Sequence, residues 1–234
     1  MPLRFALVMA LLLVAMAGCH SNEGGDKLPD PELARLHQRV ADFEHRLAAI
    51  RSAMPDARNV EDQACPDDAI EKQLHGKTGS LLLAEYEALG RYAGKSADDR
   101  GRWKFLTTPA LRVVPPLAQV HTKKQTIDAL WNIKKVQRDY AYIAVLRSSR
   151  RELPRMDGKK YHPGAFSGGL FMFDLDSGKP LCRARVDAHS TDQVAGVQGQ
   201  PPAQALWNDF SLRLRHELDR ALSRVSHQLE LDFG

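Results

Sequence analysis

GGLFMFDLDSGKPLCRARVDA, residues 168–188, has the pattern of a β-hairpin, and the fold prediction for this 234-residue chain starts from it. Two runs rich in aliphatic and aromatic residues flank DSGK, a hairpin turn signal in which Gly178 is free to adopt a positive φ. After the turn, Cys182 and every second residue are apolar, whereas Arg183 and Arg185 lie between them, so the two sets occupy opposite faces of a strand. We predict an antiparallel hairpin with Cys182 directed toward the core.

Helical and strand patterns surround the hairpin. YAYIAVLR (140–147) is aromatic and β-branched, which indicates a strand. Helices are predicted over 31–54, 126–137 and about 203–229, where apolar residues recur with helical spacing. The predicted fold class is α+β: a central antiparallel sheet, made of the hairpin and the strand near 140–147, packed by N- and C-terminal amphipathic helices.

Two segments have weaker patterns. Residues 80–94 form a buried run that fits either a helix or a strand followed by a helix, because short apolar runs are ambiguous. Residues 111–114 lie between proline signals, and we expect a strand there within a long packed loop.

The helix over 31–54 has the clearest apolar seam. Asp30 can cap it, Pro31 fits its first turn, and Pro55 ends it. Seven apolar residues recur at alternating intervals of three and four: Leu33, Leu36, Val40, Phe43, Leu47, Ile50 and Met54. Such a seam can form a coiled-coil dimer or can pack on the helix's own domain, and we favour the second.

An apolar run near the N-terminus ends at a cysteine, in LLLVAMAGCHSNEG (11–24). Residues 5–18 carry no charge, and these 14 residues are fewer than the roughly 20 that span a bilayer. Their length fits the core of a secretory signal. Cleavage before Gly18 by the ordinary signal peptidase would leave a soluble periplasmic protein.

The end of this run, Met16-Ala17-Gly18-Cys19, resembles the lipobox of bacterial lipoproteins, with Met16 where Leu is usual. The resemblance covers only the first 19 residues and implies a diacylglycerol-modified, acylated Cys19 that attaches the chain to a membrane. The polar, turn-rich segment that follows suits a tether. Residue 20 is His rather than the Asp of the common inner-membrane retention signal, which favours the periplasmic face of the outer membrane.

These features predict a signal peptide (1–18), a lipidated tether (19–30) and a single α+β domain (31–234). Removing the signal takes away Arg4 and changes the formal charge from +4 to +3. A mixed surface and export both argue against a nucleic-acid partner. The expected contacts are the membrane, through the lipid, and a protein or cell-wall partner.

Cys65 and Cys182 remain if Cys19 is lipidated. An oxidising compartment would join them, and only one pairing is available. Neither lies in a C-x-x-C motif or near paired histidines, so we expect no metal site.

One basic segment stands out as a candidate binding loop for anionic lipid heads or cell-wall polymers. Its cations are Arg147, Arg150, Arg151, Arg155, Lys159 and Lys160. The alternative is an ordinary solvated loop, which we favour.

No catalytic motif is complete, and the sequence predicts neither a catalytic residue nor a cofactor. His162, His189 and Asp187 are the side chains that a hydrolase would most plausibly use, but nothing fixes their mutual geometry. We therefore expect a lipid-anchored cell-envelope binding or scaffolding module. The alternatives are a periplasmic hydrolase-like enzyme and a structural subunit that dimerises through 31–54.

Overall fold

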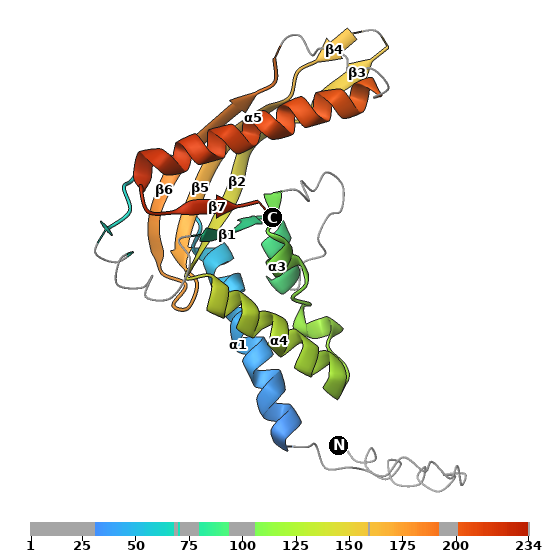
Figure 1. The fold of residues 1–234 in the computed structure, drawn as a ribbon, viewed down its shortest axis with the longest axis vertical. Helices are drawn as coiled ribbons and strands as arrows, with labels where there is room; N and C mark the ends of the chain where they lie inside the picture. The colour runs from blue at the N-terminus through green and yellow to red at the C-terminus, as the bar shows by residue number, and fades with distance from the viewer. Residues whose placement is uncertain are drawn as a thin grey trace, which may run out of the picture.

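The computed structural model of this chain shows an α+β fold with a curled, mixed sheet (Figure 1). It describes residues 31–67, 70, 80–93, 106–158, 160–191 and 201–233. Cys19 and the predicted signal and tether therefore lie outside the described residues.

The sheet has five strands in the order β6-β5-β2-β1-β7. The strands are β1 (Ser80–Glu85), β2 (Tyr142–Glu152), β5 (Ala165–Asp174), β6 (Pro180–His189) and β7 (Glu230–Asp232). β5 is antiparallel to both β2 and β6, as predicted, whereas β1 runs parallel to both β2 and β7. The prediction of a purely antiparallel sheet is thus wrong for β1 and β7. β1 is buried along almost its whole length and lacks the alternation of a half-exposed strand.

The hairpin is confirmed. β5 and β6 pair antiparallel, and Gly178 in the turn has a φ of 69°. The Gly178 N–H donates to the Asp174 carbonyl at 2.9 Å, which closes the turn. On β6, Cys182 is buried and Arg185 is exposed, so the predicted assignment of the two faces is also confirmed.

The three predicted helices are present as α1 (Pro31–Ala53), α4 (Lys123–Asp139) and α5 (Pro202–Val225). α4 starts with a capping box between Thr122 and Gln125. α5 ends before the predicted boundary near 229, because Ser226 takes an extended conformation that leads the chain into β7.

Between β1 and α4 the chain forms short helical turns: η1 (Ala88–Ala93), α3 (Pro109–Arg112) and η3 (Leu117–Gln119). The predicted strand at 111–114 is wrong. Pro109 begins a helical turn, and the Leu111 N–H donates to the Thr108 carbonyl at 3.0 Å. Within the segment predicted as buried, the described residues 80–93 form a strand followed by a 3-10 helix.

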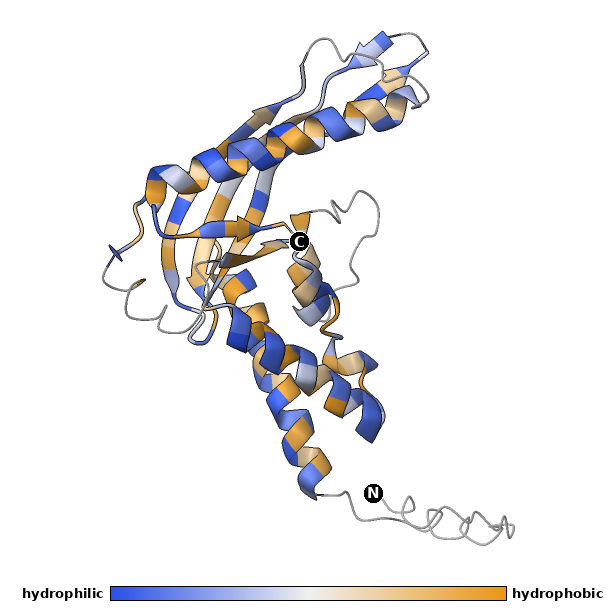
Figure 2. Ribbon diagram, viewed as in Figure 1, coloured by the Kyte–Doolittle hydropathy of each residue, from blue (hydrophilic) through white to orange (hydrophobic). Residues whose placement is uncertain are grey.

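Each face of the sheet has its own hydrophobic core. α1 and α4 pack against one face and α5 against the other, with hydrophobic residues of each helix turned inward (Figure 2). Val40, Phe43, Leu47 and Ile50 of the α1 seam are at most 1% exposed. From Val40 to Met54 the seam is thus buried within this chain, as favoured from the sequence, whereas Leu33 and Leu36 are half-buried.

The structure also brings Cys65 and Cys182 to disulfide distance, with their Cα atoms 4.7 Å apart across 117 residues of sequence. This is the predicted pairing. It fastens the segment after α1 to the edge strand β6, beside hydrogen bonds between Gln63 and the Arg183 backbone.

Candidate functional site

The predicted arginine loop is not a loop. β2 continues through Arg150 and Arg151 to Glu152. The chain then forms a two-stranded ribbon of β3 (Arg155–Asp157) and β4 (Lys160–His162). Lys159 lies outside the described residues. The sequence indicated a loop because this stretch has many charges and little apolar alternation. These strands lie at the end of the sheet, where charged side chains remain exposed.

The cations of this segment point to different partners. Arg150 pairs with Glu152 at 2.8 Å, whereas Arg151 approaches the buried Glu85 at 3.9 Å. Arg155 and Lys160 lie on the separate ribbon. The described cations of this segment thus lie on two different elements, and their role in binding stays a prediction.

Arg147 has a structural position. Its Nη1 donates to the carbonyls of Met54 at 2.9 Å and Pro55 at 2.6 Å. Its guanidinium lies 4.5 Å from the Tyr86 ring centroid, and that of Arg51 lies 4.3 Å from the same centroid. These cation–π contacts fasten the end of α1 to the end of β1.

The residues considered for a hydrolase are not joined by hydrogen bonds in the described structure. His162 lies on β4, where its Nε2 is buried and has no hydrogen-bond partner among the described residues. Asp187 accepts from Arg185 Nε at 2.5 Å, and His189 is exposed at the end of β6. Burial opposes the ionisation of Asp187, but hydrogen bonds from Arg185 and Ser167 outweigh it and lower the pKa. A carboxylate engaged with arginine is a poor general base.

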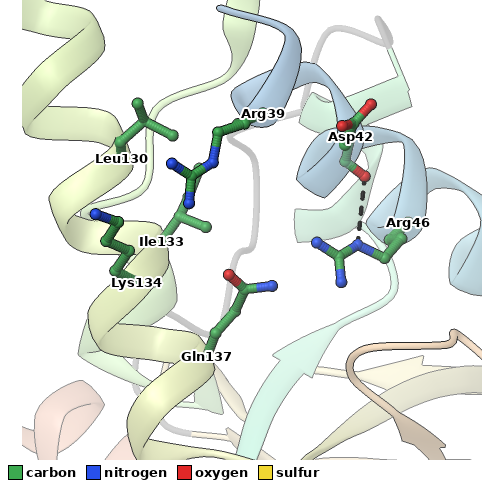
Figure 3. Close-up of a pocket in the computed structure, with 7 residues that line it drawn as sticks. All are labelled: Arg39, Asp42, Arg46, Leu130, Ile133, Lys134 and Gln137. Carbon is green, nitrogen blue, oxygen red and sulfur yellow. Dashed lines mark hydrogen bonds between the residues drawn. The ribbon is translucent and has the colours of Figure 1, made fainter. Parts of the chain in front are cut away.

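Among the described residues, no group of three or more His, Cys, Asp or Glu side chains is placed to hold a metal ion. A different candidate site lies between α1 and α4. A cavity of about 190 Å³ opens there, lined by Arg39, Asp42, Arg46, Leu130, Ile133, Lys134 and Gln137 (Figure 3).

The packing of the two helices positions this cavity. They run in the same direction: His37 of α1 hydrogen-bonds Thr126 of α4 at 2.9 Å, and further along Arg46 lies beside Gln137. Ile133 is buried and forms part of the helix–helix contact, so the polar side chains at its edge are held around a fixed apolar floor.

Arg46 is the fixed member of the site. Its Nη1 donates to the Asp176 carbonyl at 3.1 Å and lies 3.5 Å from the Asp176 carboxylate. Its Nε donates to the Asp42 carbonyl at 3.4 Å, the dashed line in Figure 3. The β5–β6 turn therefore neutralises and orients this guanidinium.

The amide of Gln137 links Arg46 to the cavity. One end of the amide faces Arg46 and the other faces the cavity (Figure 3). Because a guanidinium can only donate, the oxygen belongs at the Arg46 end, where it accepts from Nη2 at 3.0 Å and Nη1 at 3.3 Å. The NH₂ group of Gln137 is then available as a donor toward the cavity.

Arg39 and Lys134 supply the unneutralised charge. Both are exposed, and neither forms an ion pair with a residue in the described part of the chain. The one acid of the lining, Asp42, has an oxygen that accepts from Gln38 at 2.8 Å. Two cations and an amide donor from different helices thus surround one small opening, which is the chemistry of a site for a phosphate or carboxylate.

The sequence patterns alone did not indicate this site. Arg39, Asp42 and Arg46 recur at helical spacing beside the α1 seam, which could have marked a polar stripe. Their partners on α4 could not be identified, because the register of α1 against α4 depends on tertiary packing.

In comparisons with known proteins, no family model, curated protein or solved structure matches this chain. Across the described residues, none of the helices combines the length and apolar character needed to cross a membrane.

Proposed function

We propose that this chain is a lipid-anchored cell-envelope binding module, attached through Cys19, that binds a phosphate or carboxylate group between α1 and α4. The observation that carries the proposal is the convergence of Arg39, Lys134 and the Gln137 amide on one cavity. The lipobox resemblance supports the anchor, and the outer membrane remains the expected location. The envelope also supplies many anionic groups, on lipids and on wall polymers.

The site suits weak binding of a single small anion. An exposed ion pair contributes about 0.2–1 kcal/mol, and a dissociation constant of 1 mM corresponds to about −4.1 kcal/mol. We therefore expect millimolar affinity for a lone phosphate. Useful affinity would come from a partner that presents many such groups at once.

The pocket is tested by titrating the isotope-labelled, lipid-free chain (Cys19→Ser) with inorganic phosphate and following side-chain NMR signals. The Arg39 Nε–H and Gln137 NH₂ signals should shift and saturate at millimolar phosphate. The double variant Arg39→Ala/Lys134→Ala should lose the Gln137 shift. Arg35→Ala, which removes an exposed cation one turn earlier on α1 and outside the cavity, should keep it.

Two results would overturn the proposal that this pocket binds an anion. One is the absence of a saturable shift at Arg39 and Gln137. The other is an equal Gln137 shift in the double variant.

The anchor is tested separately by cell fractionation. In membranes washed with high salt, which removes proteins held by surface charge, Cys19→Ser should move the protein from the membrane fraction to the soluble periplasmic fraction, because the acyl chains are lost. Attachment of this variant that survives the high-salt wash would refute the anchor.

A further inference from the structure

α4 leaves large apolar side chains in solvent. Trp131 is 63% exposed and Ile127, one turn earlier, is 49% exposed. Val113 is 57% exposed and lies near them, because Asn132 donates to its carbonyl at 3.1 Å. The opposite side of α4 is buried against α1 and the sheet, so the fold does not require these residues to be apolar.

Basic residues surround this apolar pair. At 100° per residue, the outward face of α4 carries Ile127, Trp131, Lys134 and Arg138. Beside them lie Lys123, Lys124 and Lys135. Lys135 Nζ lies 5.8 Å from the Trp131 ring centroid, and Arg138 pairs with Asp139 at 2.8 Å. Asp128 is the other acid of the helix, so the face is strongly positive.

This face is continuous with the pocket. Lys134 belongs to both, and Arg39 extends from α1 toward α4 in the same pocket lining (Figure 3). We name the combined surface, made of Arg39, Ile127, Trp131, Lys134, Lys135 and the neighbouring lysines, the α1–α4 basic face.

From this arrangement we infer that the α1–α4 basic face lies on the anionic phospholipid leaflet that holds the anchor, with lipid phosphates at the pocket and Trp131 and Ile127 entering the interface. Indole rings favour the membrane–water boundary. Helices with Lys and Arg around an apolar face bind anionic lipid surfaces. The inference rests on the proposed function, because it names the source of the anionic group that the pocket binds.

The predicted tether permits this contact. The 12 residues of the tether, 19–30, can extend about 40 Å at roughly 3.3–3.6 Å each. α1 rises only about 12 Å between Pro31 and Arg39, at about 1.5 Å per residue. The basic face is therefore within reach of a membrane that holds Cys19.

Vesicle flotation of the lipid-free chain (Cys19→Ser) tests the inference. We expect the protein to float with vesicles of phosphatidylethanolamine and phosphatidylglycerol, and to stay unbound with phosphatidylcholine alone or in high salt. Trp131→Ala/Ile127→Ala should weaken binding at least tenfold. Leu212→Ala, which removes an exposed apolar residue of α5, should not.

Two charge-reversal variants complete the test. Lys134→Glu/Lys135→Glu should abolish flotation, whereas Arg155→Glu/Lys160→Glu on the distant ribbon should leave it intact. Binding that is equal in all four variants, or equal on anionic and zwitterionic vesicles, would overturn the inference.

The phosphate titration separates this inference from the proposed function. Phosphate binding at Arg39 without any flotation would overturn the membrane contact and leave the pocket in place, with a protein or wall polymer as its partner. Flotation that depends on Trp131 while phosphate produces no shift at Gln137 would overturn the pocket.

Discussion

The Cα of Cys182 on β6 lies 4.7 Å from that of Cys65, although 117 residues separate them in sequence. The bridge therefore closes a loop that contains β1, α4, β2 and β5. It joins the segment leaving α1 to the edge strand against which α5 packs.

Loss of the Cys65–Cys182 disulfide should lower the stability of the fold. We expect Cys65→Ser/Cys182→Ser to lower the free energy of unfolding by about 4–5 kcal/mol, because the loop is over 100 residues long. Urea unfolding followed by circular dichroism measures this change. Wild-type protein treated with reductant should match the double variant, and a loss below about 1 kcal/mol in both would contradict a formed bridge.

Asp62 reinforces the same junction. Its carboxylate accepts from Arg224 Nε at 2.6 Å and from the Arg185 N–H at 2.7 Å, and the Arg224 hydrogen bond lowers the pKa of Asp62 below its usual 3.8. Because the folded-state pKa is depressed, the contribution is present above about pH 4 and is lost as the pH falls through the folded value. Its partly exposed ion pair should contribute about 1 kcal/mol at most.

The measurement is urea unfolding of Asp62→Asn at pH 7 and pH 3. The variant should be destabilised by up to about 1 kcal/mol at pH 7, and the difference from wild type should shrink at pH 3. Glu61→Gln, which changes an exposed neighbouring acid, should differ little from wild type at either pH. A constant difference across this range would show that the carboxylate charge is unimportant.

The buried Tyr92 hydroxyl should make the stability of the fold depend on pH in the alkaline range. This hydroxyl donates to the Val114 carbonyl at 2.9 Å, and burial raises its pKa to about 12. The folded state favours the neutral phenol, so this contribution is complete below about pH 10 and is lost as the pH rises from there toward 12.

Tyr92→Phe should therefore lower stability at pH 8 by about 1 kcal/mol through the lost hydrogen bond, and its stability should fall less steeply than that of wild type above pH 10. Unfolding curves at pH 8, 10 and 11 give both quantities. Tyr161→Phe is the matched control, because the Tyr161 hydroxyl has no partner among the described residues, and it should cost little at pH 8. Parallel pH curves for wild type and Tyr92→Phe would contradict this assignment.

Local patterns predicted much of the fold. The hairpin around Gly178, the three long helices and the pairing of Cys65 with Cys182 all follow from turn chemistry, periodicity and cysteine count. The parallel placement of β1 and β7 does not, because β1 lacks alternation and β7 has only three residues, Glu230–Asp232.

The candidate site was harder to predict than the fold. Ile127 and Trp131 fit an apolar helical pattern in the sequence, yet α4 buries its other side and leaves both in solvent. Arg39 and Lys134 meet only because α1 and α4 pack in one particular register. By contrast, the described cations of the predicted binding loop lie on two faces of β2 and on the separate β3–β4 ribbon.

The membrane contact of α4 can be measured directly through Trp131. In a lipid-free chain carrying Trp103→Phe and Trp207→Phe, Trp131 is the single indole, and its emission reports its surroundings. On anionic vesicles containing brominated acyl chains, the emission should shift to shorter wavelength and be quenched, and phosphatidylcholine vesicles should leave it unchanged. Emission that stays at its aqueous wavelength and is not quenched on anionic vesicles would contradict the placement of the α1–α4 basic face on the membrane.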